Sequence, residues 1–395
     1  MFKYFPTNYV WNIAINLALE MGAKIGEIDE MCQPVLDASR KGDDAGTVDF
    51  MRSWVEMADK LSDLAQEDLV QGRELSAGSK LARASTYYLT AERLQSSGFA
   101  ERLPLYQKFL AAFQRSILLS GENCERLEIP YEGTHLSALY VRAEGVKGPA
   151  PVLVQVNGLD STKEMVYRIA PAQALARRGV SSLILDQPGT GEALRLQGLT
   201  AVVDSERWAS KVMDFLETRK DMDSKRIGLM GVSLGGYYAP RAVAFEPRFA
   251  LGAVWGANHN WGEVQLRRLR NEGDRPVPHY WEHVQWVWGK QNMEEFMELI
   301  PQIHLNGILD RIRVPFLVTH GADDRQIPLD YAHQTYAGLV NSPDRELKIF
   351  TRREGGSQHS SLDNSSNAGD FIADWVTERL GGRTHTQGKA VAQQH

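Results

Sequence analysis

The stretch Leu229–Pro240, LMGVSLGGYYAP, places Ser233 between two glycines, with one residue on either side of the serine. The apolar run RIGLM (226–230) before it has the composition of a buried strand, and GYYAPRAVAFE (236–246) after it is predicted to be a helix. A G-x-S-x-G sequence between a strand and a helix is typical of a sharp turn that holds a serine hydroxyl above a sheet. The same spacing also suits a purely structural turn, so the decision depends on partners elsewhere in the chain.

Further short apolar runs alternate with helical stretches on both sides of this turn. Such runs, bounded by turn residues, are typical of strands that are buried on both faces of a parallel sheet. Two other runs alternate in polarity and are joined by a Glu-Gly pair, which predicts an antiparallel hairpin. The expected fold class is therefore α/β, a mostly parallel sheet with an antiparallel edge hairpin. The apolar runs are PVLVQVNG (151–158), VSSLILDQPG (180–189), ALGAVWGAN (250–258), VPFLVTHG (314–321) and ELKIF (346–350), and the hairpin runs are ERLEIPYEG (125–133) and HLSALYVRA (135–143).

The N-terminal part of the chain, about residues 8–119, has a helical pattern. Apolar residues recur there at steps of three and four, with breaks at Gly42, Gly72 and Gly98, which predicts four or five helices. One segment resembles a helix of a tetratricopeptide repeat, but no second copy follows at a fixed period, so a packing surface is favoured over a peptide-binding array. The expected domains are a helical N-terminal domain (1–120), an α/β core (121–258 and 312–380), a helical cap insertion (259–311) and a disordered tail (381–395).

The insertion follows from the spacing of the strands. About 55 residues separate the run that ends at Asn258 from the run that starts at Val314, whereas an ordinary crossover needs far fewer. Aromatic residues are frequent in and just before this stretch, and their rings could either cover a binding pocket or fasten the insertion to the sheet. The candidates for substrate contact are Trp255, Trp261, Glu263, Tyr280 and Trp281, although Glu263 also fits an ordinary charged group on a helix surface.

Composition excludes several classes of protein. The 395 residues carry a formal net charge of −6 and lack a dense lysine and arginine run, so no nucleic-acid partner is expected. Two cysteines are too few for a disulfide framework, which favours a reducing compartment. Polar residues such as Asn12 and Glu20 interrupt the apolar N-terminus, and no run of about 18 apolar residues occurs, so neither a signal peptide nor a membrane span is expected. We expect a cytoplasmic protein.

A serine hydroxyl is a poor nucleophile at neutral pH unless a histidine, oriented by a carboxylate, accepts its proton. The loop THGADDRQIP (319–328) follows a strand and offers Asp323 and Asp324, and GGSQHSSLDN (355–364) follows the last strand and contains His359. The order Ser233, Asp324, His359 is the order found in α/β hydrolases. Asp324 is preferred because H-G-x-x-D-x-x-I-P, matched from position 320 to 328, resembles the acid loop of that superfamily, which leaves Asp323 as a turn residue.

The other histidines fit the role of base less well. His333 falls in an expected surface helix, and His385 and His395 fall in the polar tail. His279 and His283 stand four residues apart without a third ligand in register, so no zinc site is expected. The segment DQPGTGE (186–192) lacks the lysine and the glycine spacing of a nucleotide-binding loop and is interpreted as a turn beside the pocket. The predicted chemistry uses no metal and no cofactor.

An oxyanion forms when the serine attacks a carbonyl, and it needs hydrogen-bond donors that are already in place. The backbone N–H of Leu234, directly after the serine and at the positive end of a helix, is one expected donor. The other is expected from the loop NGLDSTKE (157–164), through the N–H of Leu159 or Gly158. The Asn-Gly pair of this loop also fits a plain turn.

These residues resemble the α/β hydrolase superfamily over about residues 125–380. More narrowly, NGLDSTKE, LDQPGTGE and GVSLGGYYAPRAVAFEPRF resemble a subgroup with a helical N-terminal region. This subgroup includes dihydroxypseudooxynicotine hydrolases, fungal polyketide chain-shortening hydrolases and esterases of the fermentation-respiration-switch type. The chain departs from the subgroup at Asn157, where a glycine is often found.

The resemblance implies that the N-terminal helices and the insertion cover the pocket, and that the protein forms a homodimer. It also implies a reaction, since several members cleave a carbon–carbon bond next to a ketone, often on an aromatic ring, and others cleave esters. We therefore expect a serine hydrolase that cleaves a carbon–carbon bond in a small aromatic or polyketide-like substrate. The alternative within the class is a carboxylesterase for aryl or alkyl esters. An alternative of another class is an inactive hydrolase fold that serves as a binding module.

Overall fold

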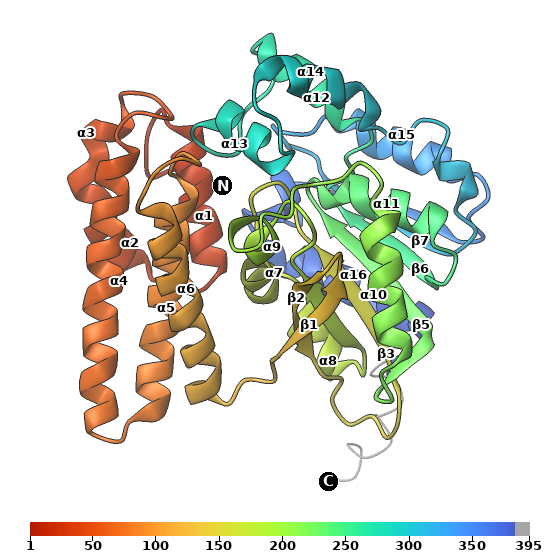
Figure 1. The fold of residues 1–395 in the computed structure, drawn as a ribbon, viewed down its shortest axis with the longest axis horizontal. Helices are drawn as coiled ribbons and strands as arrows, with labels where there is room; N and C mark the ends of the chain where they lie inside the picture. The colour runs from red at the N-terminus through yellow and green to blue at the C-terminus, as the bar shows by residue number, and fades with distance from the viewer. Residues whose placement is uncertain (384–395) are drawn as a thin grey trace. The chain divides into compact units, whose positions relative to one another are not determined.

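An eight-stranded sheet is the centre of one of the two units into which the chain divides in this computed structural model, which describes residues 1–383 (Figure 1). The strand order is β1-β2-β4-β3-β5-β6-β7-β8, in which β3 to β8 are parallel and β1 and β2 are antiparallel. The mostly parallel sheet and its edge hairpin are thus confirmed. The strands are β1 (Glu125–Tyr131), β2 (Thr134–Val141), β3 (Ala150–Val156), β4 (Ser181–Leu185), β5 (Met222–Val232), β6 (Leu251–Trp255), β7 (Phe316–Gly321) and β8 (Arg345–Phe350).

Burial explains why the strands differ in sequence. Every residue of β3, β4, β6 and β7 is buried, because helices cover both faces of a parallel sheet. Strand β1 lies at the edge and exposes alternate residues, so its sequence alternates in polarity. The apolar runs therefore predicted the central strands, and the alternation predicted the edge.

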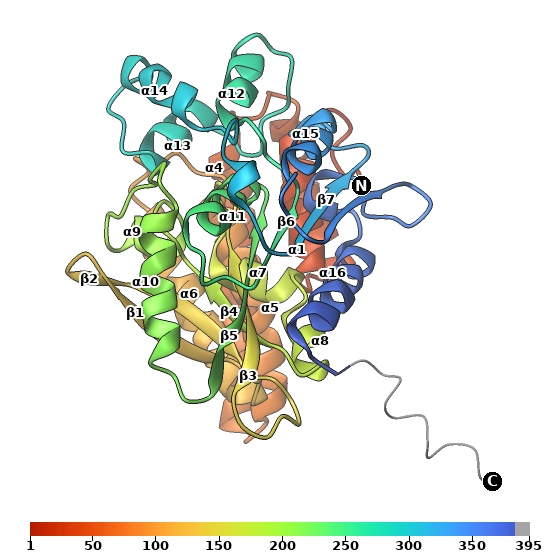
Figure 2. The same ribbon diagram turned by 90° about the vertical axis from the view of Figure 1, so that its right-hand side faces the viewer.

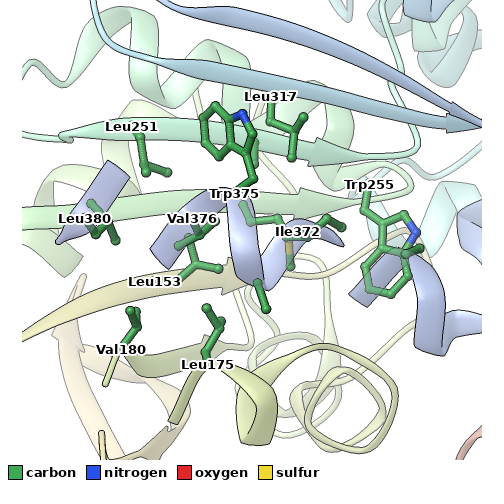
Figure 3. Close-up of a cluster of buried hydrophobic side chains, with 14 of the residues drawn as sticks. Leu153, Leu175, Val180, Leu251, Trp255, Leu317, Ile372, Trp375, Val376 and Leu380 are labelled. Atoms are coloured by element: carbon green, nitrogen blue, oxygen red, sulfur yellow. The ribbon is translucent and has the colours of Figure 1, made fainter. Parts of the chain in front are cut away.

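Helices pack on both sides of this sheet: Figure 2 shows α10 on one side of the strands and α8 and α16 on the other. On the α16 side, Ile372 and Trp375 join Leu153 of β3 and Leu251 of β6 in one buried cluster (Figure 3). Each large apolar side chain buried in this way contributes roughly 1.5–3 kcal/mol. The helices of this unit are α7 (Lys163–Ile169), α8 (Ala172–Arg177), α9 (Gly191–Arg195), α10 (Glu206–Glu217), α11 (Gly235–Phe245), α12 (Trp261–Leu269), α14 (Met293–Leu299), α15 (Asp330–Gly338) and α16 (Ser365–Leu380), with single 3-10 turns η2 (Ile300–Gln302), η3 (Leu309–Arg311) and η4 (His359–Ser361).

The other unit is helical and consists of Met1–Asn123 and Arg275–Trp286. Its long helices α4, α5 and α6 pack side by side. A continuous series of ring contacts fills its core, with centroids 4.7–5.6 Å apart along Phe5, Trp11, Phe50, Trp54 and Tyr87. The N-terminal helices are α1 (Tyr9–Glu20), α2 (Ile25–Cys32), η1 (Gln33–Val35), α3 (Leu36–Ser39), α4 (Thr47–Val70), α5 (Glu74–Arg93) and α6 (Arg102–Ser120).

The stretch expected as an insertion, 259–311, is divided between the two units. Its middle part, which carries most of α13 (Tyr280–Val287), belongs with the N-terminal helices. The backbone N–H of His279 donates to Asp44 Oδ1 at 2.6 Å, and the N–H of Gly98 donates to Glu282 Oε1 at 3.1 Å. Hydrogen bonds over a large sequence separation therefore tie this segment to the helical unit.

Two further expectations were a polar C-terminal tail and the lack of a membrane span. The tail expected from residue 381 lies outside the described residues from position 384 onward, and so do His385 and His395. Within residues 1–383, none of the helices combines the length and the apolar composition that crossing a bilayer requires.

Candidate active site

The turn between β5 and α11 holds Ser233 in a left-handed conformation, with φ of 58°. Such a conformation costs a non-glycine residue free energy and persists where the surroundings enforce it. The flanking glycines make the turn possible: a Cβ on Gly231 would lie 1.9 Å from the carbonyl oxygen of Gly235, and one on Gly235 would lie 3.0 Å from that of Asn157. The serine N–H donates to the carbonyl oxygen of Trp255 at 2.9 Å. The sequence LMGVSLGG therefore folds into a tight turn anchored to β6.

The structure brings the three residues expected to react into one hydrogen-bonded series. The Oγ of Ser233 lies 2.8 Å from Nε2 of His359, and Nδ1 of His359 lies 2.8 Å from Oδ2 of Asp324. A carboxylate can only accept a hydrogen bond, so Nδ1 carries a proton and Nε2 of the neutral ring is left to accept from the serine hydroxyl. The arrangement can move a proton from the serine to the imidazole.

Asp324 is held as a buried carboxylate. Its side chain is fully buried, and its Oδ1 accepts hydrogen bonds from the N–H groups of Gln326 and Ile327 at 2.8 and 3.0 Å. Burial alone would raise the pKa of Asp324, but the charge and hydrogen bond of His359, together with the backbone donor, bring that pKa below its ordinary value. Asp324 therefore stays ionised next to the imidazole.

Asp323 points elsewhere. Its carboxylate accepts from Arg352 Nε at 2.7 Å and from Ser357 Oγ at 2.8 Å. The hydrogen bond from Arg352 lowers the pKa of Asp323. The two adjacent aspartates are thus separated by their partners: Asp324 contacts the imidazole, and Asp323 braces the segment that leads to it.

A second buried histidine, His320, supports the loop that carries Asp324. This role was not predicted from the sequence. The N–H of Ala257 donates to His320 Nδ1 at 3.1 Å, so the proton of the ring is on Nε2, which donates to the carbonyl oxygen of Ile327 at 3.1 Å. Burial lowers the pKa of His320, which keeps the ring neutral. His320 therefore links the end of β6 to the loop that carries Asp324, and its place in the H-G-x-x-D pattern was the available signal.

The loop after His359 is also strained and anchored. Ser360 and Ser361 have φ angles of 47° and 55°, and Ser361 Oγ accepts a hydrogen bond from the indole nitrogen of Trp255 at 3.0 Å. Trp255 was a candidate for substrate contact, but it is 2% exposed and its ring joins the buried cluster on the α16 side of the sheet (Figure 3). The hydrogen bond from its indole nitrogen to Ser361 supports the loop that carries His359.

The loop after β3 contains the other expected oxyanion donors. The N–H of Gly158 donates to Ser161 Oγ at 2.8 Å, so this amide is already engaged. Among residues 1–383, the N–H groups of Leu159 and Leu234 have no hydrogen-bond acceptor. A Cβ on Gly158 would lie 2.9 Å from the Cβ of Ser233, so this loop passes directly against the serine.

The remaining candidates for substrate contact lie in the expected insertion. Trp261 is buried, and its ring lies 5.4 Å from that of Trp288 and 5.9 Å from that of Phe296. Glu263 is partly exposed, and its Oε1 lies 3.3 Å from Nη2 of Arg270. Tyr280 and Trp281 belong to the helical unit, where their rings lie 5.1 Å apart. Trp261 therefore packs the insertion onto itself, and Glu263 pairs with Arg270 on the exposed side of the same helix.

Two other candidate histidines and a buried acidic cluster have surroundings of their own. His333 lies exposed on α15. The Nε2 of His279 lies 3.2 Å from Thr47 Oγ1. The carboxylates of Glu164, Asp186 and Glu192 could together hold a metal ion, but the ammonium group of Lys163 lies 2.6–2.9 Å from an oxygen of each. A side-chain cation therefore already occupies the centre of this cluster.

Two family models match the chain. The model of the prolyl oligopeptidase family matches residues 168–383, and the model of FrsA-like esterases matches residues 48–256. Each covers more than half of the sequence, and together they include the strands, the serine turn and the histidine loop as well as most of the helical unit.

Curated relatives and solved structures agree with the family models. Hydrolase acrC of Aspergillus aculeatus is 29% identical, covering 92% of this chain and 94% of that protein. The 2,6-dihydropseudooxynicotine hydrolase of Paenarthrobacter nicotinovorans is 28% identical, covering 76% and 77%. The crystal structure of 2,6-dihydroxy-pseudo-oxynicotine hydrolase superposes with a TM-score of 0.73 over 93% of this chain and 95% of that chain, at 23% identity, and so shows the same fold.

Proposed function

Because the chain belongs to the FrsA-like esterase and prolyl oligopeptidase families, and so to the α/β hydrolases, we propose that it hydrolyses its substrate with Ser233 as the nucleophile. The protein is a hydrolase related to carbon–carbon bond hydrolases and esterases. The observation that carries the proposal is the continuous series from Ser233 Oγ through His359 to Asp324, with both distances at 2.8 Å.

In the proposed mechanism, Nε2 of His359 accepts the serine proton while Oγ of Ser233 bonds to the substrate carbonyl carbon. The carbonyl π electrons move to oxygen, and the N–H groups of Leu234 and Leu159 donate to the oxyanion. Asp324 stabilises the imidazolium. Collapse of the tetrahedral intermediate breaks the bond to the leaving group, which takes the proton from His359. Water then repeats the sequence on the acyl-enzyme and releases a carboxylic acid.

For the substrate, we propose a ketone on an aromatic or polyketide-like compound, cleaved at a carbon–carbon bond. The support is the pair of relatives whose names specify such compounds, the dihydropseudooxynicotine hydrolase and the 20-hydroxy-prefusarin hydrolase FUS2 of Gibberella moniliformis. In this reaction the bonding electrons leave on carbon, so the leaving group must be protonated at carbon and benefits from a ring that delocalises the charge. Glu263 and Trp261, which belong to the same unit as Ser233, are the proposed contacts to that group.

The second candidate is a carboxylesterase, favoured by the match to the FrsA-like esterases. Both candidates use the same serine, histidine and aspartate, and they differ in the leaving group, which is an alcohol or phenol for an ester and a carbon acid for a ketone. Product analysis therefore separates them more directly than mutagenesis of the shared residues.

A pair of substrates with one acyl group tests the choice of bond. Phenyl butyrate and 1-(2,6-dihydroxyphenyl)butan-1-one both yield butyrate, together with phenol and resorcinol respectively. Release of resorcinol by the wild type and its loss in Ser233→Ala would support carbon–carbon cleavage. Turnover of the ester alone would remove that proposal and leave the esterase.

A fluorophosphonate probe tests whether the protein is an enzyme of this kind at all. The probe reacts with an activated serine, so we expect a covalent adduct at Ser233 that is located by mass spectrometry and is absent in Ser233→Ala. Folded wild-type protein that gives no adduct would instead favour the inactive binding module.

Assembly and location belong to the same proposal. We propose a homodimer in the cytoplasm. The dimer is supported by the resemblance to the subgroup of α/β hydrolases with a helical N-terminal region. The location is supported by the low cysteine content. Light scattering of the purified chain at micromolar concentration measures the mass of the assembly. A mass equal to that of one chain would contradict the homodimer.

A further inference from the structure

We propose that Lys163 and Asp186 are positioning residues that hold the loop Asn157–Thr162 in the shape needed for the Leu159 N–H to bind the oxyanion. This inference depends on the proposed serine mechanism, since it assigns a role to a buried ionic cluster that the mechanism does not use directly. The cluster lies between the loop after β3 and the loop after β4, and neither residue contacts the reacting atoms.

Asp186 is the centre of the cluster. It directly follows β4, is fully buried and accepts hydrogen bonds on both carboxylate oxygens. Its Oδ1 accepts from the backbone N–H of Lys163 at 2.7 Å and from Asn157 Nδ2 at 3.2 Å. Its Oδ2 accepts from Lys163 Nζ at 2.9 Å and from the N–H of Glu192 at 3.0 Å. One carboxylate therefore fixes both ends of the Asn157–Thr162 loop, at Asn157 and at Lys163 directly after Thr162.

Lys163 provides the matching positive charge. Its side chain is 1% exposed, and Nζ lies 2.7 Å from Glu164, 2.9 Å from Asp186 and 2.6 Å from Glu192. Burial alone would lower the pKa of Lys163, but the negative charges around it raise that pKa well above its ordinary value, so the ammonium group stays charged. A buried ion pair of this kind costs much of its attraction in desolvation and is therefore weak support for stability alone.

The loop is locked at a second point by Gln187. Its side-chain amide makes two hydrogen bonds with the backbone of Asn157: Oε1 accepts from the N–H at 3.1 Å and Nε2 donates to the carbonyl oxygen at 3.0 Å. Asn157 Oδ1 in turn accepts from Ser161 Oγ at 3.0 Å. Asn157 is therefore fixed on its backbone and on both atoms of its side-chain amide.

These contacts bear on the reaction through geometry. Oxyanion donors accelerate the reaction because they are oriented before the charge develops, and loss of a single donor costs about 10²–10³-fold in rate. A donor on an unrestrained loop would have to be ordered during each turnover. The buried charges of the cluster therefore serve to fix the position of one amide group, the N–H of Leu159.

The test is Lys163→Met, which removes the ammonium group and keeps the length of the side chain. The readout is the reaction of Ser233 with a fluorophosphonate, resolved into the limiting rate of adduct formation and the half-saturating probe concentration. We expect the limiting rate to fall about 10- to 100-fold. The half-saturating concentration should change by less than about threefold, and the pH midpoint of the reaction by less than about half a pH unit. A merely structural residue would not change the limiting rate selectively.

Arg248→Met is the matched control. Arg248 likewise binds three carboxylates, those of Glu246, Asp214 and Glu217, at 2.7–3.0 Å. It precedes β6, at the edge of the parallel strands opposite to the ends from which the loops around Ser233 leave. We expect its labelling rate to remain within about threefold of the wild-type rate. An equal loss in both variants would overturn the proposal, because it would show a general effect of losing ion pairs.

A neutral variant keeps the test decisive if Lys163→Met fails to fold. Gln187→Leu removes both hydrogen bonds to the Asn157 backbone without leaving a buried charge, and we expect the same selective fall in the limiting rate. A folded Gln187→Leu or Lys163→Met protein that labels at the wild-type rate would refute the positioning role. If the wild type itself fails to label at Ser233, the serine mechanism is wrong. If the wild type labels and the variants label equally fast, only the positioning role is wrong.

Discussion

The backbone N–H of Ser233 donates to the carbonyl oxygen of Trp255 at 2.9 Å, and the indole nitrogen of the same tryptophan donates to Ser361 at 3.0 Å. Trp255 at the end of β6 thus joins the serine turn to the loop that carries His359. The proposed nucleophile and its base lie 126 positions apart in the chain, and one buried residue between them holds both segments.

We predict that Trp255→Phe lowers the labelling rate of Ser233 while the fold is retained. Phenylalanine keeps an aromatic ring in the cluster but cannot donate to Ser361, which then relaxes from its left-handed conformation and shifts His359. The unfolding free energy should fall by about 1–3 kcal/mol, as measured in urea. Trp375→Phe is the control, because Trp375 is equally buried and its indole nitrogen has no acceptor among residues 1–383. Equal rates for the two variants would contradict the role of the indole bond.

Asp324→Asn should reduce turnover by about 10⁴-fold with little change in stability, because an amide can donate to His359 and so stabilise the wrong tautomer of the ring. Asp323→Asn should reduce turnover less than about tenfold, since Asp323 contacts Arg352 and Ser357 and not the imidazole. Steady-state turnover of a phenyl ester by both variants measures the difference. A larger loss at Asp323 would exchange the proposed roles of the two residues.

Gly231→Ala should impair both folding and activity. The new Cβ would lie 1.9 Å from the carbonyl oxygen of Gly235, and because both atoms belong to the turn around Ser233, relief of this clash must move the serine. We expect a loss of at least about 1–3 kcal/mol in unfolding free energy. Gly26→Ala on α2 is the control: no atom lies within 4 Å of the added Cβ, so the variant should be as stable as the wild type or up to about 1 kcal/mol more stable. Thermal melts of the two variants, followed by circular dichroism, provide the comparison.

Two carboxylates that contact Lys163 should respond to pH with opposite signs. Burial alone would raise the pKa of Glu192, but Lys163 and Arg126 lower it from 4.5 to about 2, so its ionised form stabilises the folded state. This stabilisation, about 3 kcal/mol, is fully present above pH 4.5 and is lost as the pH falls towards 2. Burial raises the pKa of Glu164, so the folded state favours its protonated form and stability decreases as the pH rises above 4.5.

Glu192→Gln should therefore destabilise the protein at pH 7 and have little effect near pH 2. Glu164→Gln should leave the stability at pH 7 unchanged or raise it, because the amide resembles the protonated acid and Oε2 of Glu164 has no hydrogen-bond partner among the described residues. Urea unfolding at pH 2, 3, 5 and 7 measures both effects. Equal losses for the two variants at pH 7 would show that the charges of these carboxylates do not differ in the way we infer.

The strands and the three residues of the hydrogen-bonded series could be located from local patterns. An apolar run between turn residues specifies a strand of a buried parallel sheet wherever it occurs, and the ends of such strands meet at one edge. Ser233, Asp324 and His359 each follow a different strand at this edge, so their order and their loops predict that they lie close together. The choice between Asp323 and Asp324 required a family pattern, since adjacent residues share the same local signals.

Local sequence patterns did not predict which charged and aromatic side chains would be buried. Lys163 occurs in a polar loop, where a lysine normally lies in solvent, and it is buried because Glu164, Asp186 and Glu192 surround it. Two of these carboxylates lie more than twenty positions away, Asp186 in the loop after β4 and Glu192 at the start of α9. Trp255 was a candidate for a substrate contact, and its contacts with Ser361 depend on the packing of β6 against a loop over 100 positions later.

The sequence by itself determined the fold class, the glycine turn around Ser233 and the histidine and aspartate loops, because each depends on residues that are neighbours in the chain. The tertiary structure alone decided which cation occupies the acidic cluster and which tryptophan supports the site. These outcomes depend on desolvation and on hydrogen bonds between distant segments, and both are set only when the strands and loops have packed together.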